Sequence, residues 1–97
     1  MAENVYSTVR KIFAGRGENY LRSIAYKMLA LLRAENLKEL EILTDDLLLK
    51  NASEESSKLL DIREKYSNDK EKLLKFYYKF EAGLISAIPE KSEKGGE

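Results

Sequence analysis

A single proline, Pro89, occurs in the 97 residues of this chain, and the residues before it carry apolar side chains at a spacing of three to four. That period places apolar residues on one face of an α-helix, whereas a strand would need strict alternation. Proline is also the residue that most strongly interrupts helices. The sequence therefore predicts an all-α bundle of about five helices over residues 1–88 as one domain, followed by a charged, disordered tail over residues 89–97.

Glycine and helix-capping side chains divide the proline-free region into the expected helices. Gly15 ends the first helix, since glycine readily adopts the left-handed conformation that follows a last turn. Asn36, Ser53 and Asn68 are expected N-caps, because a short polar side chain accepts a hydrogen bond from the first turn. Asn36 and Asn68 are each followed three residues later by glutamate, the capping-box pattern. The expected helices span residues 3–14 and 18–35, a segment from Asn36 to Lys50 and Asn51, a segment beginning after Ser53, and a last segment from Asn68 to Ile88.

The apolar side chains of each expected helix form one stripe that faces the core. The expected core residues are Val5, Val9, Ile12, Phe13, Leu21, Ile24, Ala25, Met28, Leu31, Leu32, Leu37, Leu40, Leu43, Leu47, Leu48, Leu59, Leu60, Ile62, Tyr66, Leu73, Phe76, Tyr77, Phe80, Leu84 and Ala87. Gly83 lies inside the last helix, where glycine costs about 1 kcal/mol relative to alanine. We therefore expect another backbone to approach closely at Gly83.

The residue types that are missing exclude many chemical functions. Without histidine or cysteine, the chain cannot build the Glu-x-x-His sites of di-iron bundles, the Arg-x-x-x-x-x-His pattern of small helical ribonucleases, or a thiolate metal site. Asp45 and Asp46 are adjacent and would point about 100° apart on a helix, so they cannot hold one ion together. We expect no enzymatic activity, no metal or other cofactor, and no small-molecule substrate.

Two further features of the sequence bear on class and location. The start, "MAENVYSTVRKIF", lacks the apolar core of a signal peptide, and no run approaches the roughly 18 apolar residues that span a bilayer. A cytoplasmic protein with no membrane partner is therefore expected. Charged residues make up 35% of the chain, against about 25% in an ordinary globular domain, and this composition is typical of thermophile proteins.

The formal net charge is zero, but the charges are unevenly distributed. Residues 1–34 hold six lysines and arginines against two acids, residues 35–69 hold five against ten, and residues 70–97 hold six against five. Attraction of the whole molecule to nucleic acid is therefore not predicted, and a local patch would have to supply it. The first and last regions are the ones that could carry such a patch.

Helical spacing groups the cations of these two regions. Three lysines share a stripe on the last expected helix, and Arg22, Tyr26 and Arg33 lie within about 40° of each other on the second. Arginine forks bind phosphates and a tyrosine ring can stack on a base, which together suit nucleic-acid binding without sequence preference. The same spacing also fits a solvated face or a protein partner with an acidic rim. The expected nucleic-acid-binding positions are Arg10, Lys11, Arg16, Arg22, Tyr26, Lys27, Arg33, Lys72, Lys75 and Lys79.

The segment "GRGEN", Gly15 to Asn19, precedes a helix N-terminus, where backbone N–H groups attract anions. No strand is expected before it, and neither the dinucleotide-binding nor the phosphate-loop spacing of glycines is present. We interpret it as a helix–helix turn. A non-catalytic contact between Arg16, these amides and a phosphate is the alternative.

Two longer stretches carry a family resemblance. They are "NYLRSIAYKMLALLRAENLKELEILTDDLLLKN" and, after a spacer, "KLLKFYYKFEAGLISAIPEK", which together cover 53 of the 97 residues. This pattern resembles the small subunit of type I CRISPR effector complexes (Cascade) and the related helical C-terminal domain of the large subunit in some of those systems. The matching features are Leu21, Arg22, Ala25, Tyr26, Lys27, Leu32 and Asn36, followed by Phe76, Phe80, Gly83, Leu84 and Ile85.

The resemblance implies a non-catalytic subunit of a ribonucleoprotein complex in antiviral defence. Copies would line up along the guide RNA, contact other Cascade subunits, and support the target or displaced DNA strand through basic side chains, first of all Arg22, Lys27 and Arg33. The acidic middle region departs from the family pattern, and we expect it to meet a basic neighbour, which would favour head-to-tail stacking. The alternative is a helical protein–protein adaptor or oligomerisation module that binds no nucleic acid.

Overall fold

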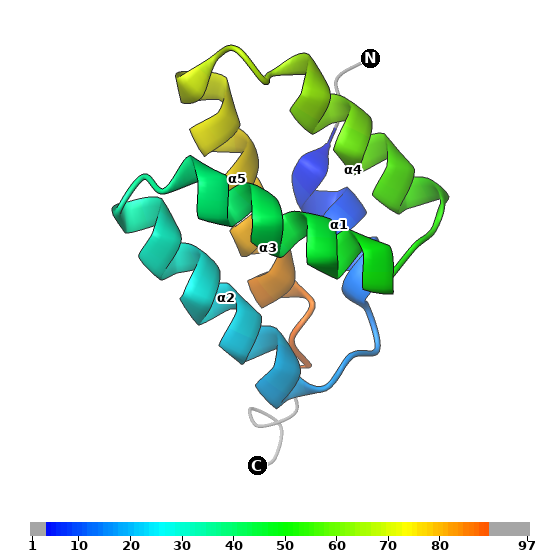
Figure 1. Cartoon of the computed structure of the whole chain (residues 1–97). Coiled ribbons are helices and arrows are strands. Elements are labelled where there is room, and N and C mark those ends of the chain that lie inside the picture. The colour runs from blue at the N-terminus through cyan, green and yellow to red at the C-terminus, as the bar shows by residue number, and fades with distance from the viewer. Residues whose placement is uncertain (1–3, 90–97) are drawn as a thin grey trace.

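The computed structural model describes residues 4–89, which form five α-helices and no strand (Figure 1). The helices are α1 (Val5–Phe13), α2 (Glu18–Arg33), α3 (Leu37–Lys50), α4 (Glu54–Lys65) and α5 (Lys70–Ser86). The prediction of an all-α bundle with five helices is confirmed. The expected disordered tail, apart from Pro89 at its start, lies outside the described residues.

Helix α5 is the helix on which α1 and α2 pack most extensively. Both α1 and α2 pack along α5 and make little contact with each other, so they flank it on two sides. Helix α3 packs on α2, α4 and α5, while α4 packs on α1 and α3. Figure 1 looks onto α3 and α4, with α5 passing behind α3. The five helices pack into a compact globule (Figure 1).

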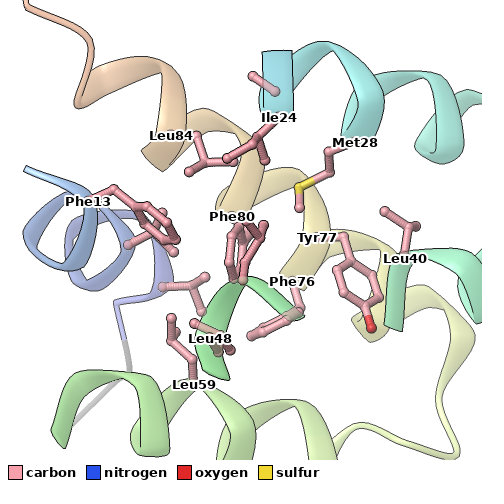
Figure 2. Close-up of a cluster of buried hydrophobic side chains, with 14 of the residues drawn as sticks. Phe13, Ile24, Met28, Leu40, Leu48, Leu59, Phe76, Tyr77, Phe80 and Leu84 are labelled. Carbon is pink, nitrogen blue, oxygen red and sulfur yellow. The ribbon is translucent and has the colours of Figure 1, made fainter. Parts of the chain in front are cut away.

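The core is centred on aromatic side chains of α5, which meet apolar residues from the other four helices (Figure 2). The ring of Phe80 lies 6.3 Å from that of Phe13 and 6.1 Å from that of Phe76, and Phe76 meets Tyr77 edge-on at 5.2 Å. These tilted and edge-on arrangements are the ones that aromatic rings prefer. Most of the expected core is buried, and the remainder is half-buried against it, namely Ile12, Leu31, Leu37, Leu43, Leu60, Tyr66, Leu73 and Ala87.

Gly83 is the point at which α1 and α5 come closest. A Cβ atom at this position would lie 2.7 Å from the carbonyl oxygen of Tyr6 and 2.7 Å from the Cβ of Val9. Real Cβ atoms essentially never approach other atoms so closely. The expectation of a close backbone approach at Gly83 is confirmed, and the neighbour is the backbone of α1.

Most of the expected helix ends are confirmed by hydrogen bonds. Gly15, at φ +87°, follows α1 as predicted. The side chain of Asn36 accepts a bond from the N–H of Glu39 at 3.2 Å, and that of Ser53 accepts from Ser56 at 3.2 Å. The predicted cap at Asn68 is wrong: Asp69 caps α5, accepting from the N–H of Lys72. A carboxylate here also interacts favourably with the positive end of the helix, which an amide would do less well.

Helix α2 is two residues shorter than expected, since it ends at Arg33 and not at Glu35. Glu35 adopts the left-handed conformation at φ 53°. The N–H of Asn36 donates to the carbonyl of Leu31 and that of Glu35 to the carbonyl of Leu32, both at 2.9 Å. This pair of bonds is the Schellman arrangement, which satisfies carbonyls that the ended helix leaves free. It also uses the Asn36 N–H that Glu39 would have bonded in a complete capping box.

Candidate nucleic-acid interface

Three lysines of α5, which the spacing placed on one stripe, line one depression. Lys72, Lys75 and Lys79 are exposed and line a hollow of about 200 Å³. The other residues that line it are Val5 from α1, Ile62 and Tyr66 from α4, and Phe76 from α5. Within the part of the chain that the structure describes, none of the three lysines forms an ion pair with an acid. Their charges are therefore available to an external anion.

A second depression of about 340 Å³ lies along α1 and α4 and shares the lining residue Ile62 with the first. Asn4 and Thr8 of the α1 segment line it together with Lys58, Asp61, Ile62 and Lys65 of the α4 segment. Ile62 lines both hollows, so we treat them as one feature, the lysine groove, defined by the lining residues of the two depressions. Five lysines and one acid, Asp61, border this groove.

Two local features shape the electrostatics of the lysine groove. Asn4 is the N-cap of α1, so the positive end of that helix dipole opens at the groove and adds to the field of the lysines. The ammonium of Lys72 sits 5.7 Å from the centroid of the Tyr66 ring, within range of a cation–π interaction. This contact occupies a face of the Tyr66 ring and holds the Lys72 charge at the α4 side of the groove.

The cations that precede α2 are placed differently from those of α5. Arg10 and Lys11 are exposed on α1, and neither lines the lysine groove. Arg16 is half-buried, and its guanidinium donates to the side-chain oxygen of Asn51, with Nε at 3.0 Å. Its Nη1 also donates to the carbonyl of Ala14 at 3.4 Å. Arg16 thus ties the turn after α1 to the end of α3, and "GRGEN" is a helix–helix turn, as we interpreted it.

The four predicted positions on α2 lie apart from the lysine groove. The Nε of Arg22 is 2.9 Å from a carboxylate oxygen of Glu18, and this hydrogen bond raises the pKa of the Arg22 guanidinium. Tyr26 is 65% exposed and Arg33 is exposed. Lys27 lines a different depression, between α2 and α3. Because α1 and α2 flank α5 on different sides, the ten predicted positions do not form one cluster.

Lys58 and Lys65 border the lysine groove, but sequence reasoning missed both. They belong to the acidic middle region, whose ten acids against five cations hid them from a count by region. Their positions form a pattern with Ile62, at i, i+4 and i+7, which places them on one side of a helix. This spacing could have predicted that Lys58 and Lys65 share a helix face. That the face borders the groove depends on the packing of α4 on α1, which the sequence did not reveal.

Arg63, which was not among the predicted positions, also forms its contacts within the protein. Arg63 of α4 donates to Asp45 at 2.7 Å and to the hydroxyl of Thr44 at 3.2 Å, and its side chain is 13% exposed. Burial lowers the pKa of the Arg63 guanidinium, but its hydrogen bond to Asp45 and the nearby charges together outweigh that effect and raise the pKa. Burial also raises the pKa of the Tyr77 hydroxyl beside it. This network joins α3, α4 and α5 and is structural.

Comparisons with protein-family models, curated proteins and solved structures found no match. Over residues 4–89, no three acidic side chains converge on a position that could hold a metal ion. No helix in that range has the length and apolar character needed to cross a membrane.

Proposed function

We propose that the protein is a non-catalytic helical module that binds single-stranded nucleic acid along the lysine groove. The observation that supports this most strongly is the concentration of five lysines and one acid around two adjacent depressions in a chain of zero net charge. Lysine ammonium groups contact phosphates as point charges, and their release of counterions supplies most of the affinity in binding without sequence preference.

The groove favours contact with the phosphate backbone over stacking on bases. Two aromatic side chains line the groove. The ring of Tyr66 already has the ammonium of Lys72 over it, and Phe76 is buried in the core. The hollow of about 340 Å³ is in the range of small-molecule sites, whereas that of about 200 Å³ is below it. Together the two hollows suit a few nucleotides of one strand. Binding should therefore depend strongly on salt and weakly on sequence.

The assembly in which such a module acts is proposed from the sequence resemblance. On that basis the protein is a small subunit of a type I CRISPR interference complex, in which it contacts the guide RNA or the target DNA and packs against other subunits. The resemblance rests on "NYLRSIAYKMLALLRAENLKELEILTDDLLLKN" and "KLLKFYYKFEAGLISAIPEK". Affinity purification of the tagged protein from its own cells, followed by identification of bound proteins and RNA, tests it. Recovery without the subunits or guide RNA of such a complex would contradict it.

Fluorescence anisotropy with labelled single-stranded dT20 and rU20, at NaCl concentrations from 50 to 300 mM, tests binding at the groove directly. Replacing Lys72, Lys75 and Lys79 with glutamine removes three cations. For single strands the slope of log K against log salt is about −0.7 per neutralised phosphate. The triple variant should therefore bind more weakly at 50 mM NaCl, and its slope should be about 2 units shallower than that of the wild type.

A matched variant separates local contact from a change in net charge. Arg22, Arg33 and Lys38 are exposed and lie outside the lysine groove. Changing all three to glutamine removes the same total charge, and we expect a slope close to that of the wild type. Equal slopes for the wild type and the groove variant would refute binding at the groove. A larger loss from the matched variant would move the interface to α2, where the sequence had placed its first candidates.

A protein–protein adaptor is the second candidate function, and one observation favours it. Ile42 and Leu49 of α3 are 53% and 75% exposed, which is high for large aliphatic side chains. An adaptor would show no salt-dependent binding to either oligonucleotide. The same titration therefore distinguishes the two functions.

A further inference from the structure

Helices α2 and α3 present a partly apolar face that no described segment covers. A depression of about 320 Å³ lies between them, with Leu31, Ile42 and Leu43 in its lining. Ile42 is 53% exposed, and Leu49, about two turns further along α3, is 75% exposed. Residues seven apart lie on nearly the same side of a helix, so Leu49 extends the apolar strip beyond the depression. Figure 1 shows α2 and α3 side by side, joined by a short turn.

Charges on the two sides of this face are opposite. Lys27 of α2 lines one side of the depression, and Glu39 and Asp46 of α3 line the other. Neither Glu39 nor Lys27 forms an ion pair among residues 4–89, and Asp46 pairs only with Lys50, one turn away on the same helix. Counted as whole helices, α2 carries three cations and one acid, while α3 carries two cations and four acids.

We infer that this α2–α3 face binds the same face of a second copy, forming a two-fold symmetric dimer. In a two-fold interface each patch meets itself, so a patch must be self-complementary. A two-fold axis that runs along the depression places α2 of each copy over α3 of the other. The cationic helix then faces the acidic helix twice, and Ile42, Leu43 and Leu49 become covered. Zero net charge means that two copies do not repel each other overall.

The area of the α2–α3 face determines how tightly the two copies are expected to bind. Helices of 16 and 14 residues, at about 1.5 Å per residue and about 10 Å in diameter, give a footprint of about 450 Å² per copy. Stable interfaces bury about 800 Å² per partner. The dimer should therefore be weak, with a dissociation constant in the micromolar range or above, and measurements must extend to about 1 mM protein.

Sedimentation equilibrium of the purified chain from 10 µM to 1 mM tests the dimer. The weight-average mass should rise from 11.2 kDa towards twice that value. Ile42→Glu with Leu49→Glu should raise the dissociation constant at least tenfold. Both side chains are more than half exposed, so the fold should persist, which circular dichroism checks. Tyr78→Glu with Ile85→Glu is the matched control: both side chains are exposed on α5, and the double change should leave dimerisation unchanged. A wild type that stays monomeric at 1 mM would overturn the inference.

Charge reversal tests the arrangement of the two copies. Lys27→Glu alone and Asp46→Lys alone each create two like-charge contacts in a homodimer, so each variant should be monomeric. In a mixture of the two variants, the new glutamate of one copy would face the new lysine of the other, and the second contact would keep its native Lys27 and Asp46. Mixing should therefore restore the dimer. If either variant alone dimerises as well as the wild type, or if mixing restores nothing, α2 does not face α3 across the interface. Oligonucleotide binding by these variants is an independent measurement, because Lys27 and Asp46 lie outside the lysine groove. The dimer can therefore fail while binding at the groove persists.

Discussion

The contact between α1 and α5 at Gly83 gives a stability prediction whose size can be worked out. In Gly83→Ala, the new Cβ would lie 2.7 Å from the Tyr6 carbonyl oxygen, 2.7 Å from the Val9 Cβ and 2.9 Å from the Val9 Cγ1. Ordinary contact begins near 3.4 Å. The two helices would therefore have to separate by several tenths of an ångström, and the buried Val5, Val9 and Phe13 of α1 would move with them.

Two opposing terms decide the magnitude of this effect. Alanine favours a helix interior over glycine by about 1 kcal/mol. Overpacking a well-packed core costs about 1–3 kcal/mol, and here the upper part of that range applies because one of the two obstructing groups is backbone. We expect a net loss of about 1–2 kcal/mol in the free energy of unfolding, which corresponds to about 5–15 °C in Tm for a domain of this size.

Urea unfolding followed by circular dichroism at 222 nm measures this loss. The midpoint should fall while the slope with urea stays constant, since the surface exposed on unfolding is unchanged. Gly17→Ala is the control, because a Cβ there would meet nothing within 4 Å and the backbone φ of −67° suits alanine. Gly17 is the N-cap of α2, where alanine is less favourable than glycine, but alanine also lowers the conformational entropy of the unfolded chain. These terms oppose each other, so the net effect should be within about 0.5 kcal/mol. A Gly83→Ala protein as stable as the wild type, or more stable, would refute the reasoning about close packing.

Two further predictions concern single side chains of the α5 segment. Asp69→Ala should lower the free energy of unfolding by about 1 kcal/mol, because Asp69 caps α5. Asn68→Ala should change it little. If thermal melts showed the larger loss for Asn68→Ala, Asn68 would be the cap, as the sequence suggested. Burial raises the pKa of the Glu81 carboxyl, so ionisation of Glu81 costs more in the folded than in the unfolded protein. Glu81→Gln should therefore be more stable than the wild type at pH 7. That advantage should shrink as pH falls from the folded pKa to the unfolded value of about 4.3. A stability difference that is constant from pH 3 to pH 7 would contradict this.

Features that depend on local sequence were predictable, and those that depend on packing between helices were not. Asn36 and Ser53 cap their helices because each acts on a backbone N–H three residues away. Gly83 was informative because a glycine inside a helix needs a steric reason. The cap of α5 was misplaced by one residue because Asn68 and Asp69 both suit an N-cap, and the choice depends on where the preceding turn ends.

The candidate interface shows the same division between local and long-range information. The stripe of Lys72, Lys75 and Lys79 follows from helical spacing within one segment. That Lys58 and Lys65 border the same groove as these three lysines depends on how α4 packs against α1. The contact of Arg16 with Asn51 joins residues 35 positions apart, and no pattern in a single sequence links two such positions.

The position of α5 in the chain has a consequence for synthesis. The helix on which α1, α2 and α3 pack is the last of the five to leave the ribosome. Until residues 70–86 emerge, the apolar stripes of the first three helices have no common partner, and Val9, Phe13 and Leu21 remain accessible to solvent. Contacts between α1 and α5 span much of the sequence, so their closure is entropically costly and comes late. Nascent chains that stop before α5 should therefore be substrates for chaperones and proteases.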